Sequence, residues 1–159
     1  MNAAGIVPLV AGCDWLALAT IGETGSPASS YAPFALVDTA FVIAVSRLAA
    51  HARNLAARPD ASLLLIGAPS PEGDAFARPR LSVDVQARLA ARGSSLSHAV
   101  WRALHDRFGA TVSTLRDLPD FETLLLEPQR GRLILGFAAA RDLDAPSLQE
   151  ALRSAQRVR

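Results

Sequence analysis

The sequence predicts a single α+β domain that is mainly β, in which antiparallel strands curl into a small barrel with short helices at its ends. Half of the 159 residues are hydrophobic, which suffices for one closed core. Most of the predicted strands are separated by only a few residues, which is typical of antiparallel hairpins and not of βαβ units. No internal repeat or linker divides the chain, so one domain over residues 1–159 is expected.

The first third of the chain predicts a short helix and three strands. The helix covers residues 3–12, and a turn at 22–25 joins a strand over 15–21 to a returning strand over 26–34. After a second reversal at 37–39, residues 40–45 form a strand rich in β-branched and aromatic side chains. The short connections favour an antiparallel meander of these three strands.

A second helix is predicted directly after the third strand. Ser46 is a good N-cap for a helix over residues 47–57. Its core face is expected to carry Leu48, Ala52 and Leu55, which recur at helical spacing. The Arg-Pro-Asp sequence that follows ends this helix. Residues 61–66 then form a strand without alternation, for which we expect both faces to be buried.

The clearest strand covers residues 78–89. One face is apolar and comprises Pro79, Leu81, Val83, Val85, Ala87 and Leu89. The other face comprises Arg78, Arg80, Ser82, Asp84, Gln86 and Arg88. Such an alternation predicts that the apolar face packs on a core, while the polar face meets water, a ligand or a partner subunit.

The last third of the chain predicts two helices with two strands between them. The first helix covers residues 95–107, with Leu96, Val100, Leu104 and Phe108 on one stripe. A turn at 128–131 is expected to join strands over 121–126 and 132–137. The final helix covers residues 146–157, and Pro146 suits its first turn.

Composition excludes several classes of function. The net charge is +1 without blocks of like charge, which gives no footprint for nucleic acid. Cys13 is the single cysteine, which excludes an intrachain disulfide and a thiolate zinc site. No apolar run approaches the roughly 18 residues of a membrane span, and the N-terminal stretch lacks a preceding basic residue. We expect a cytoplasmic protein with neither a membrane nor a nucleic-acid partner.

The segment 46–55 is the first candidate binding site. In a helix starting at 47, the side chains of Arg47, His51 and Asn54 share one face, with Arg53 nearby. A helix N-terminus suits a phosphate, and Arg and His add charge-assisted hydrogen bonds. The alternative is the solvated polar face of a surface helix.

The second candidate is the pair Arg78 and Arg80, about 7 Å apart on one face of a strand. They could clamp a phosphate or a carboxylate-rich partner. Alternatively, they face solvent or form salt bridges in a dimer interface. His98 and His105 are about 10 Å apart along their helix, too far to chelate one metal ion together, so no metal site is predicted.

Motifs for catalysis by the chain itself are missing from the sequence. It contains neither a dinucleotide-binding glycine motif nor a Walker loop nor a nucleophile elbow. Catalytic residues therefore stay unassigned, and the pattern favours chemistry carried by a bound cofactor.

Several segments, in order, resemble pyridoxamine-phosphate-oxidase-like flavoproteins, and most closely their haem-utilisation branch. They are residues 18–21 (Leu-Ala-Thr-Ile), 25–27 (Gly-Ser-Pro), 30–34 (Ser-Tyr-Ala-Pro-Phe), 46–55 (Ser-Arg-Leu-Ala-Ala-His-Ala-Arg-Asn-Leu), 62–66 (Ser-Leu-Leu-Leu-Ile), 76–81 (Phe-Ala-Arg-Pro-Arg-Leu) and 131–137 (Gly-Arg-Leu-Ile-Leu-Gly-Phe). The match covers roughly residues 14–140. Each motif alone is weak, but their order and spacing together are moderately specific.

The resemblance implies a six-stranded antiparallel split β-barrel with flanking short helices. Such barrels form homodimers with FMN in the groove between the subunits. By the same resemblance, seven residues of this chain would bind the cofactor. Ser30 and Tyr31 would lie along the flavin, Ser46, His51 and Arg53 at the phosphate, and Arg78 and Arg80 at the phosphate or the ring.

Two departures from the family pattern bear on function. Haem-degrading members carry an iron-ligating His near the C-terminus, whereas no His follows His105 in this sequence. This argues against haem turnover. Oxidases of the superfamily usually have Lys where His51 stands, and an unperturbed His is largely uncharged near neutral pH, which weakens a phosphate contact.

Three hypotheses follow. The first is an FMN-dependent oxidoreductase or flavin reductase that acts on an unidentified small molecule. The alternative is a haem-binding protein of haem utilisation without oxidase activity. The third is a barrel that dimerises but has lost its cofactor.

Overall fold

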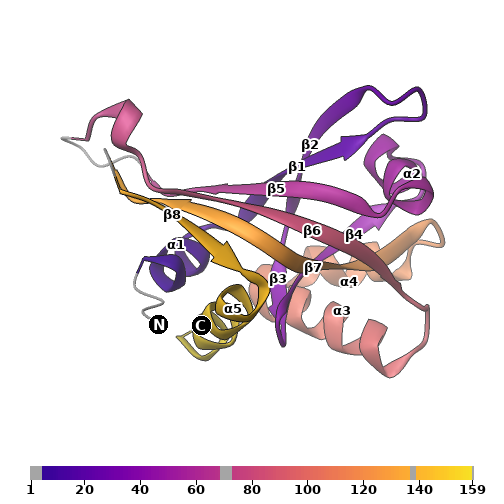
Figure 1. The fold of residues 1–159 in the computed structure, drawn as a ribbon. Helices are drawn as coiled ribbons and strands as arrows, with labels where there is room; N and C mark the ends of the chain where they lie inside the picture. The colour runs from indigo at the N-terminus through magenta and orange to yellow at the C-terminus, as the bar shows by residue number, and fades with distance from the viewer. Residues whose placement is uncertain (1–4, 69–72, 137–138, 159) are drawn as a thin grey trace.

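The computed structural model describes residues 5–68, 73–136 and 139–158. Within them, eight strands form one antiparallel sheet, in the order β2-β1-β5-β6-β7-β4-β3, with β8 paired to β7 (Figure 1). The strands are β1 (Trp15–Ile21), β2 (Pro27–Pro33), β3 (Ala35–Val37), β4 (Ala40–Ser46), β5 (Asp60–Ile66), β6 (Arg80–Ala90), β7 (Phe121–Ile134) and β8 (Ala140–Asp144). The helices are α1 (Ile6–Gly12), α2 (Ala50–Ala57), α3 (Ser95–Phe108), α4 (Ala110–Asp117) and α5 (Ala145–Val158), with a short 3-10 helix η1 (Ala75–Ala77).

The sheet is strongly curled, and the chain itself joins its two ends. β2 and β3 are the outermost strands of the sheet order, yet only Phe34 separates them in the sequence. The Phe34 side chain is fully buried and packs edge-on against Phe41 of β4. The predicted α+β, mainly β, split-barrel class is therefore confirmed.

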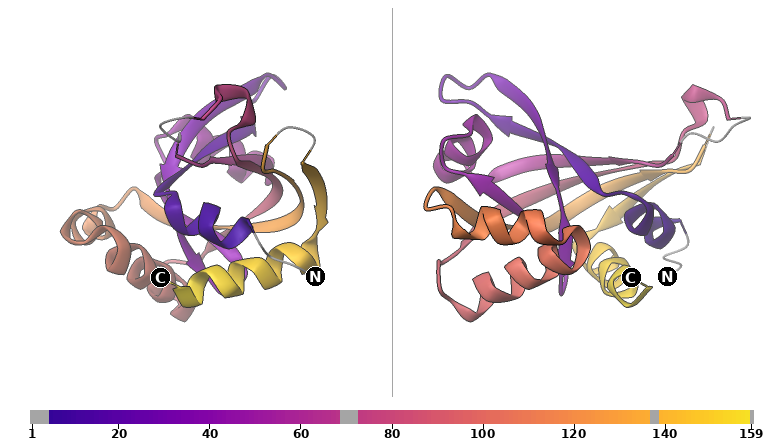
Figure 2. Two further views of the ribbon diagram at one scale, coloured as in Figure 1. Left: turned by 90° about the vertical axis from the view of Figure 1, so that its left-hand side faces the viewer. Right: turned by 180° about the vertical axis from the view of Figure 1, so that it is seen from behind.

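Two groups of helices cover different parts of the sheet. α1 and α5 pack inside the curl, which arches over them in Figure 2, and contribute Ile6, Val10, Leu148 and Leu152 to the main core. α3 and α4 cover the other side of β3 and β4 and form a second buried cluster around Trp101. β4 is consequently covered on both faces, which explains its nearly unbroken burial.

The structure corrects the pairing expected for the first strands. β1 and β2 form the predicted hairpin, with Leu18 opposite Ser30. β4 does not continue a meander from β2, because it pairs with β3 on one side and β7 on the other. Burial on both faces was also predicted for the wrong strand. It occurs in β4, whereas β5 buries Leu63 and Leu65 and leaves Leu64 between them partly exposed.

The predicted turn at 128–131 is wrong. Residues 121–134 form one strand, in which Pro128 faces Val85 and Arg130 faces Asp84, so that Gln129 is an extra residue in a β-bulge. Phe137, at the end of the predicted last strand, lies outside the described residues. The sequence interpretation also missed β3, α4 and β8, whereas the helices now labelled α1, α3 and α5 were predicted within a few residues of their bounds.

α2 begins later than predicted. Its first helical residue is Ala50, and Ala49 at the N-cap makes no side-chain capping bond. Ala52 and Leu55 are buried as expected, but Leu48 precedes the helix and is 76% exposed. Among the described residues, the helices are all too short or too polar to cross a membrane.

Candidate functional site

α2 rests against the inner face of the β1–β2 hairpin through two side-chain hydrogen bonds. Nδ1 of His51 lies 3.1 Å from the Ser30 hydroxyl, and Nδ2 of Asn54 donates to the Thr20 hydroxyl at 2.9 Å. Thr20 is 3% exposed, while His51 and Ser30 are half-buried. Burial lowers the pKa of His51 below its ordinary value of 6.5, so its imidazole is neutral at physiological pH. The structure thus brings together two of the predicted site residues, His51 and Ser30.

The Ser46 side chain was expected to cap the helix and to lie at the phosphate, but it has other hydrogen-bond partners. Its hydroxyl donates to the Asp120 carboxylate at 2.5 Å and accepts from the backbone N–H of Leu48 at 3.1 Å. It therefore caps a turn at residues 46–49 and does not cap α2. A carboxylate this close makes the position unfavourable for a phosphate, because two anions would meet with little water between them.

Three exposed arginines surround α2, and we call Arg47, Arg53 and Arg58 the arginine rim. Arg47 donates to the carbonyl of Pro119 at 3.0 Å, Arg53 to that of Leu48, and Arg58 to that of Gly22 at 2.9 Å. A guanidinium has five N–H donors, so donors on each remain for an anionic ligand. Residues 47–58 contain no Asp or Glu. Arg47 forms an ion pair with Glu122 at 3.7 Å, whereas Arg53 and Arg58 have no ion pair within the described residues, so the rim keeps a positive charge.

Tyr31 does not share a face with Ser30. Neighbouring residues of a strand point to opposite sides, and Ala32 two residues on from Ser30 is buried inside the curl. Tyr31 therefore lies on the outer face, where it is 65% exposed and meets the Trp15 ring edge-on.

Arg78 and Arg80 lie apart from the α2 site. Arg78 precedes β6, where it donates to the carbonyl of Gly67 at 2.6 Å, and Arg80 donates to the carbonyl of Arg78 at 3.0 Å. Leu81 is completely buried, so Arg80 points to the outer face. Within one chain, β1 and β5 separate Arg80 from Ser30, and the two side chains are on opposite faces of the sheet.

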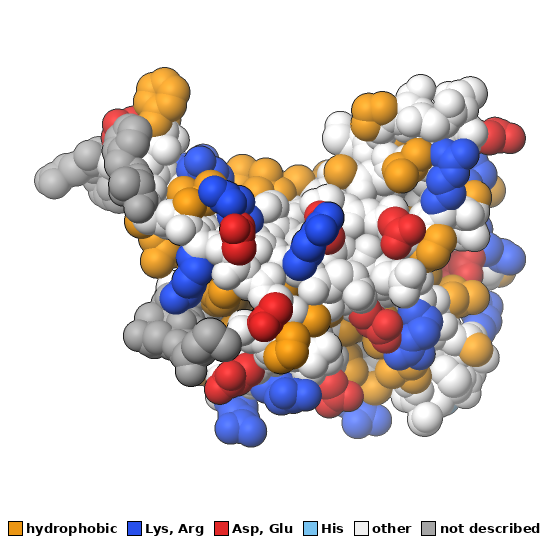
Figure 3. Space-filling view, viewed as in Figure 1, with side chains coloured by type: hydrophobic (Ala, Val, Ile, Leu, Met, Phe, Trp, Pro, Cys, Tyr) orange, Lys and Arg blue, Asp and Glu red, His pale blue; other side chains and the backbone are white. Residues whose placement is uncertain are grey.

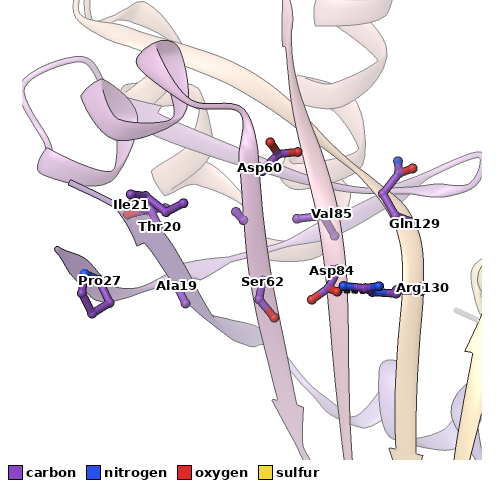
Figure 4. Close-up of a pocket in the computed structure, with 11 residues that line it drawn as sticks. Ala19, Thr20, Ile21, Pro27, Asp60, Ser62, Asp84, Val85, Gln129 and Arg130 are labelled. Atoms are coloured by element: carbon purple, nitrogen blue, oxygen red, sulfur yellow. Dashed lines mark hydrogen bonds and ion pairs between the residues drawn. The ribbon is translucent and has the colours of Figure 1, made fainter. Parts of the chain in front are cut away.

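The outer face also carries a groove that the sequence interpretation did not identify. It has a volume of about 580 Å³ and lies where β1, β2, β5, β6 and the bulge of β7 meet (Figure 4). Its lining includes Ala19, Ile21, Pro27, Asp60, Asp84 and Arg130. Asp84 and Arg130 form an ion pair at 2.6 Å, and acidic and basic side chains stand close together over this face (Figure 3). Arg130 was not predicted to face this groove, because residues 128–131 were expected to form a turn. Asp84 was already placed on the polar face by the alternation of the long strand.

The other two histidines behave as surface residues. His98 and His105 are exposed on α3, and neither side chain forms a hydrogen bond with another described residue. Across the described part of the chain, no group of three or more His, Cys, Asp or Glu side chains could hold a metal ion.

The comparisons agree with the sequence resemblance. Residues 4–135 match the family model for pyridoxamine 5'-phosphate oxidase. The haem oxygenase HutZ of Vibrio cholerae is 35% identical over 133 residues, which are 84% of this chain and 76% of HutZ. A solved structure of HutZ, described as a haem storage protein, has a TM-score of 0.76 at 32% identity and covers 86% of this chain and 96% of its own.

A haem binding protein from Mycobacterium smegmatis has a similar fold. Its structure has a TM-score of 0.83 at 28% identity over 94% of this chain, which spans 61% of the mycobacterial protein. The family match and the HutZ match each cover more than two thirds of this chain. The chain therefore belongs to the pyridoxamine 5'-phosphate oxidase family, in the haem-utilisation branch that includes HutZ.

Proposed function

We propose that this protein binds haem in the utilisation of haem iron, at the site formed by α2 and the β1–β2 hairpin. The observation that carries the proposal is the similarity to HutZ over most of both chains, combined with the chemistry of the α2 segment. Haem combines an apolar ring with two carboxylates. The arginine rim supplies cations for carboxylates, and Leu48 supplies exposed apolar surface beside it. When bound, haem would supply redox-active iron, while the chain binds and orients the group.

FMN is the second candidate, favoured by the match to the pyridoxamine 5'-phosphate oxidase family. Its phosphate would use His51 and Arg53 of α2. The residues fit FMN less well than haem, because Asp120 occupies the Ser46 hydroxyl and the neutral His51 replaces a cationic Lys. An FMN-dependent oxidoreductase that acts on a small molecule stays the alternative.

We also propose a homodimer with the cofactor near the subunit interface. Arg78 and Arg80 cannot reach the α2 site within one chain, since they lie on the other face of the sheet. A second copy of the chain is the simplest way to bring an arginine pair to a site that one chain leaves incomplete.

Parallel titrations of the purified apoprotein with ferric haem and with FMN test the proposal. We expect a saturable Soret band with haem and weak or absent binding of FMN. An Arg53→Ala/Arg58→Ala variant should bind haem more weakly, by about 1.5–3 kcal/mol for each charge-assisted bond lost. Arg157→Ala on α5, which lies away from α2 in Figure 1, is the matched control. Tight FMN binding without a Soret band would overturn the proposal and favour the flavoprotein.

A further inference from the structure

His51 has a different environment from the other two histidines of the sequence. His98 and His105 are exposed on α3, and within the described residues their imidazoles form no hydrogen bond. The His51 ring is half-buried at the junction of α2 and β2 and contacts the Ser30 hydroxyl. Within the described part of the chain, His51 is the histidine whose ring makes a hydrogen bond.

The hydrogen bond to Ser30 engages Nδ1 of His51 and leaves Nε2 as the ring nitrogen without a hydrogen bond among the described residues. A neutral imidazole carries one N–H and one lone pair. If Nδ1 carries the proton and donates it to the Ser30 hydroxyl 3.1 Å away, the lone pair is on Nε2. Histidines that bind metal ions show this arrangement, in which the second nitrogen donates to a neighbouring acceptor that fixes the tautomer and raises the basicity of the ligand.

Further hydrogen bonds attach α2 to the hairpin on the C-terminal side of His51. Asn54, one turn further along α2, is bonded to the buried Thr20 hydroxyl of β1. Arg58 just after the helix is bonded to Gly22 in the β1–β2 turn. α2 is therefore attached to the hairpin at three levels, and Figure 1 shows the helix lying against it.

We propose that Nε2 of His51 is the axial ligand of haem iron in this protein, with Ser30 as the positioning residue at Nδ1. The arginine rim would then bind the propionates beside the ring. This inference rests on the proposed haem function and adds the residue that holds the iron.

Spectroscopy of the haem complex tests the ligand directly. Purified protein is loaded with ferric haem, and absorption and electron paramagnetic resonance spectra are recorded for the wild type, His51→Ala, and the controls His98→Ala and His105→Ala. We expect His51→Ala alone to lose the histidine-type spectrum and to regain it with added imidazole. A wild type that binds haem together with an unchanged His51→Ala spectrum would overturn the ligand assignment and leave the proposed function intact. A wild type that binds no haem would overturn both.

Ser30→Ala provides a second measurement in case His51→Ala does not fold. It keeps the imidazole and removes only the acceptor at Nδ1. In the ferrous complex, resonance Raman spectroscopy should show a lower iron–histidine stretching frequency than in the wild type, because a less basic imidazole binds iron more weakly. Ser29→Ala, one residue earlier and on the outer face of β2, is the control and should leave the frequency unchanged. An equal frequency in wild type and Ser30→Ala contradicts the assignment.

Discussion

Asn54 links the candidate site to the sheet through one side-chain hydrogen bond. Its amide donates to the Thr20 hydroxyl at 2.9 Å, and Thr20 is 3% exposed. Asn54→Ala leaves this buried hydroxyl without its partner, so the free energy of unfolding should fall by about 1–3 kcal/mol. Urea denaturation measures the loss.

A double-mutant cycle separates this bond from other effects of the substitution. Thr20→Val removes the hydroxyl with little change of shape, so adding Asn54→Ala to it should cost less than the same change in the wild type. Fully additive costs would show that the bond contributes nothing to stability.

The sequence indicated some residues of the site because local periodicity determines them. The burial of Ala52 and Leu55 was predicted from helical spacing. Ser30 and Tyr31 were both predicted to lie along the flavin, but the two-residue period of a strand places them on opposite faces. The role of Ser46 was not predictable in this way. Its hydroxyl looked like an N-cap, but its partner Asp120 is 74 positions away and is brought near by the pairing of β4 with β7.

At the level of elements, the bulge in β7 shows how a local signal can mislead. Pro128 and Gly131 in four residues are typical of a turn. In the structure, the bulge accommodates the extra residue, and Gly131 lies against the Ser82 carbonyl of β6 and the Leu148 side chain of α5. Turn composition and bulge composition are similar, so only the pairing with β6 distinguishes them.

Gly131→Ala tests this close approach. A Cβ at position 131 would lie 2.9 Å from the Ser82 carbonyl oxygen and 3.3 Å from the side chain of Leu148. Because the first contact is with backbone, we expect a loss of about 1–3 kcal/mol in the free energy of unfolding. Gly12→Ala is the matched control, since a Cβ there would meet nothing within 4 Å. Equal stability of both variants in urea denaturation would contradict this account.

The start of α5 predicts a pH-dependent stability. Asp144 accepts from the backbone N–H of Ser147 at 2.9 Å, and hydrogen bonds from Ser147 lower the pKa of this carboxyl below 3.8. Because the folded state favours the carboxylate, this contribution is fully present above pH 3.8 and is lost as the pH falls through the lower folded-state pKa.

Two substitutions at Asp144 separate capping from charge. Asp144→Ala should lower the Tm at neutral pH, because the first turn of α5 loses its cap. Asp144→Asn keeps an acceptor without a titrating group, so its Tm should stay closer to that of the wild type and fall less between pH 4 and pH 2. A pH profile of Asp144→Asn identical to that of the wild type would show that another group causes the acid sensitivity.

For the whole molecule, the class of fold was predictable and the strand order was not. Short connections indicated antiparallel pairing, and hairpins such as β1–β2 were correct. The order depends on where Phe34 bends the chain, which takes β3 to the opposite end of the sheet from β2. That bend follows from burying Phe34 against Phe41 and is determined by tertiary packing.

The outer face of the sheet predicts self-association. Trp15, Ile21 and Tyr31 are exposed there, and Leu64 occupies an outward position of β5 where a water-facing strand would carry a polar residue. We expect a dimer in sedimentation equilibrium at micromolar concentration. Leu64→Lys should dissociate it without unfolding the chain, since Leu64 points away from the core, whereas Val158→Lys at the end of α5 should not.

Haem titration of the monomeric Leu64→Lys variant then tests whether one chain completes the site. We expect weaker binding than in the wild type, because Arg78 and Arg80 of the same chain lie across the sheet from His51, so that an arginine pair would have to come from a second copy. The histidine-type spectrum should nevertheless persist, since His51 and Ser30 belong to the same chain. A monomer with full haem affinity would remove the second subunit from the site, and a wild type that sediments as a monomer would contradict the dimer itself.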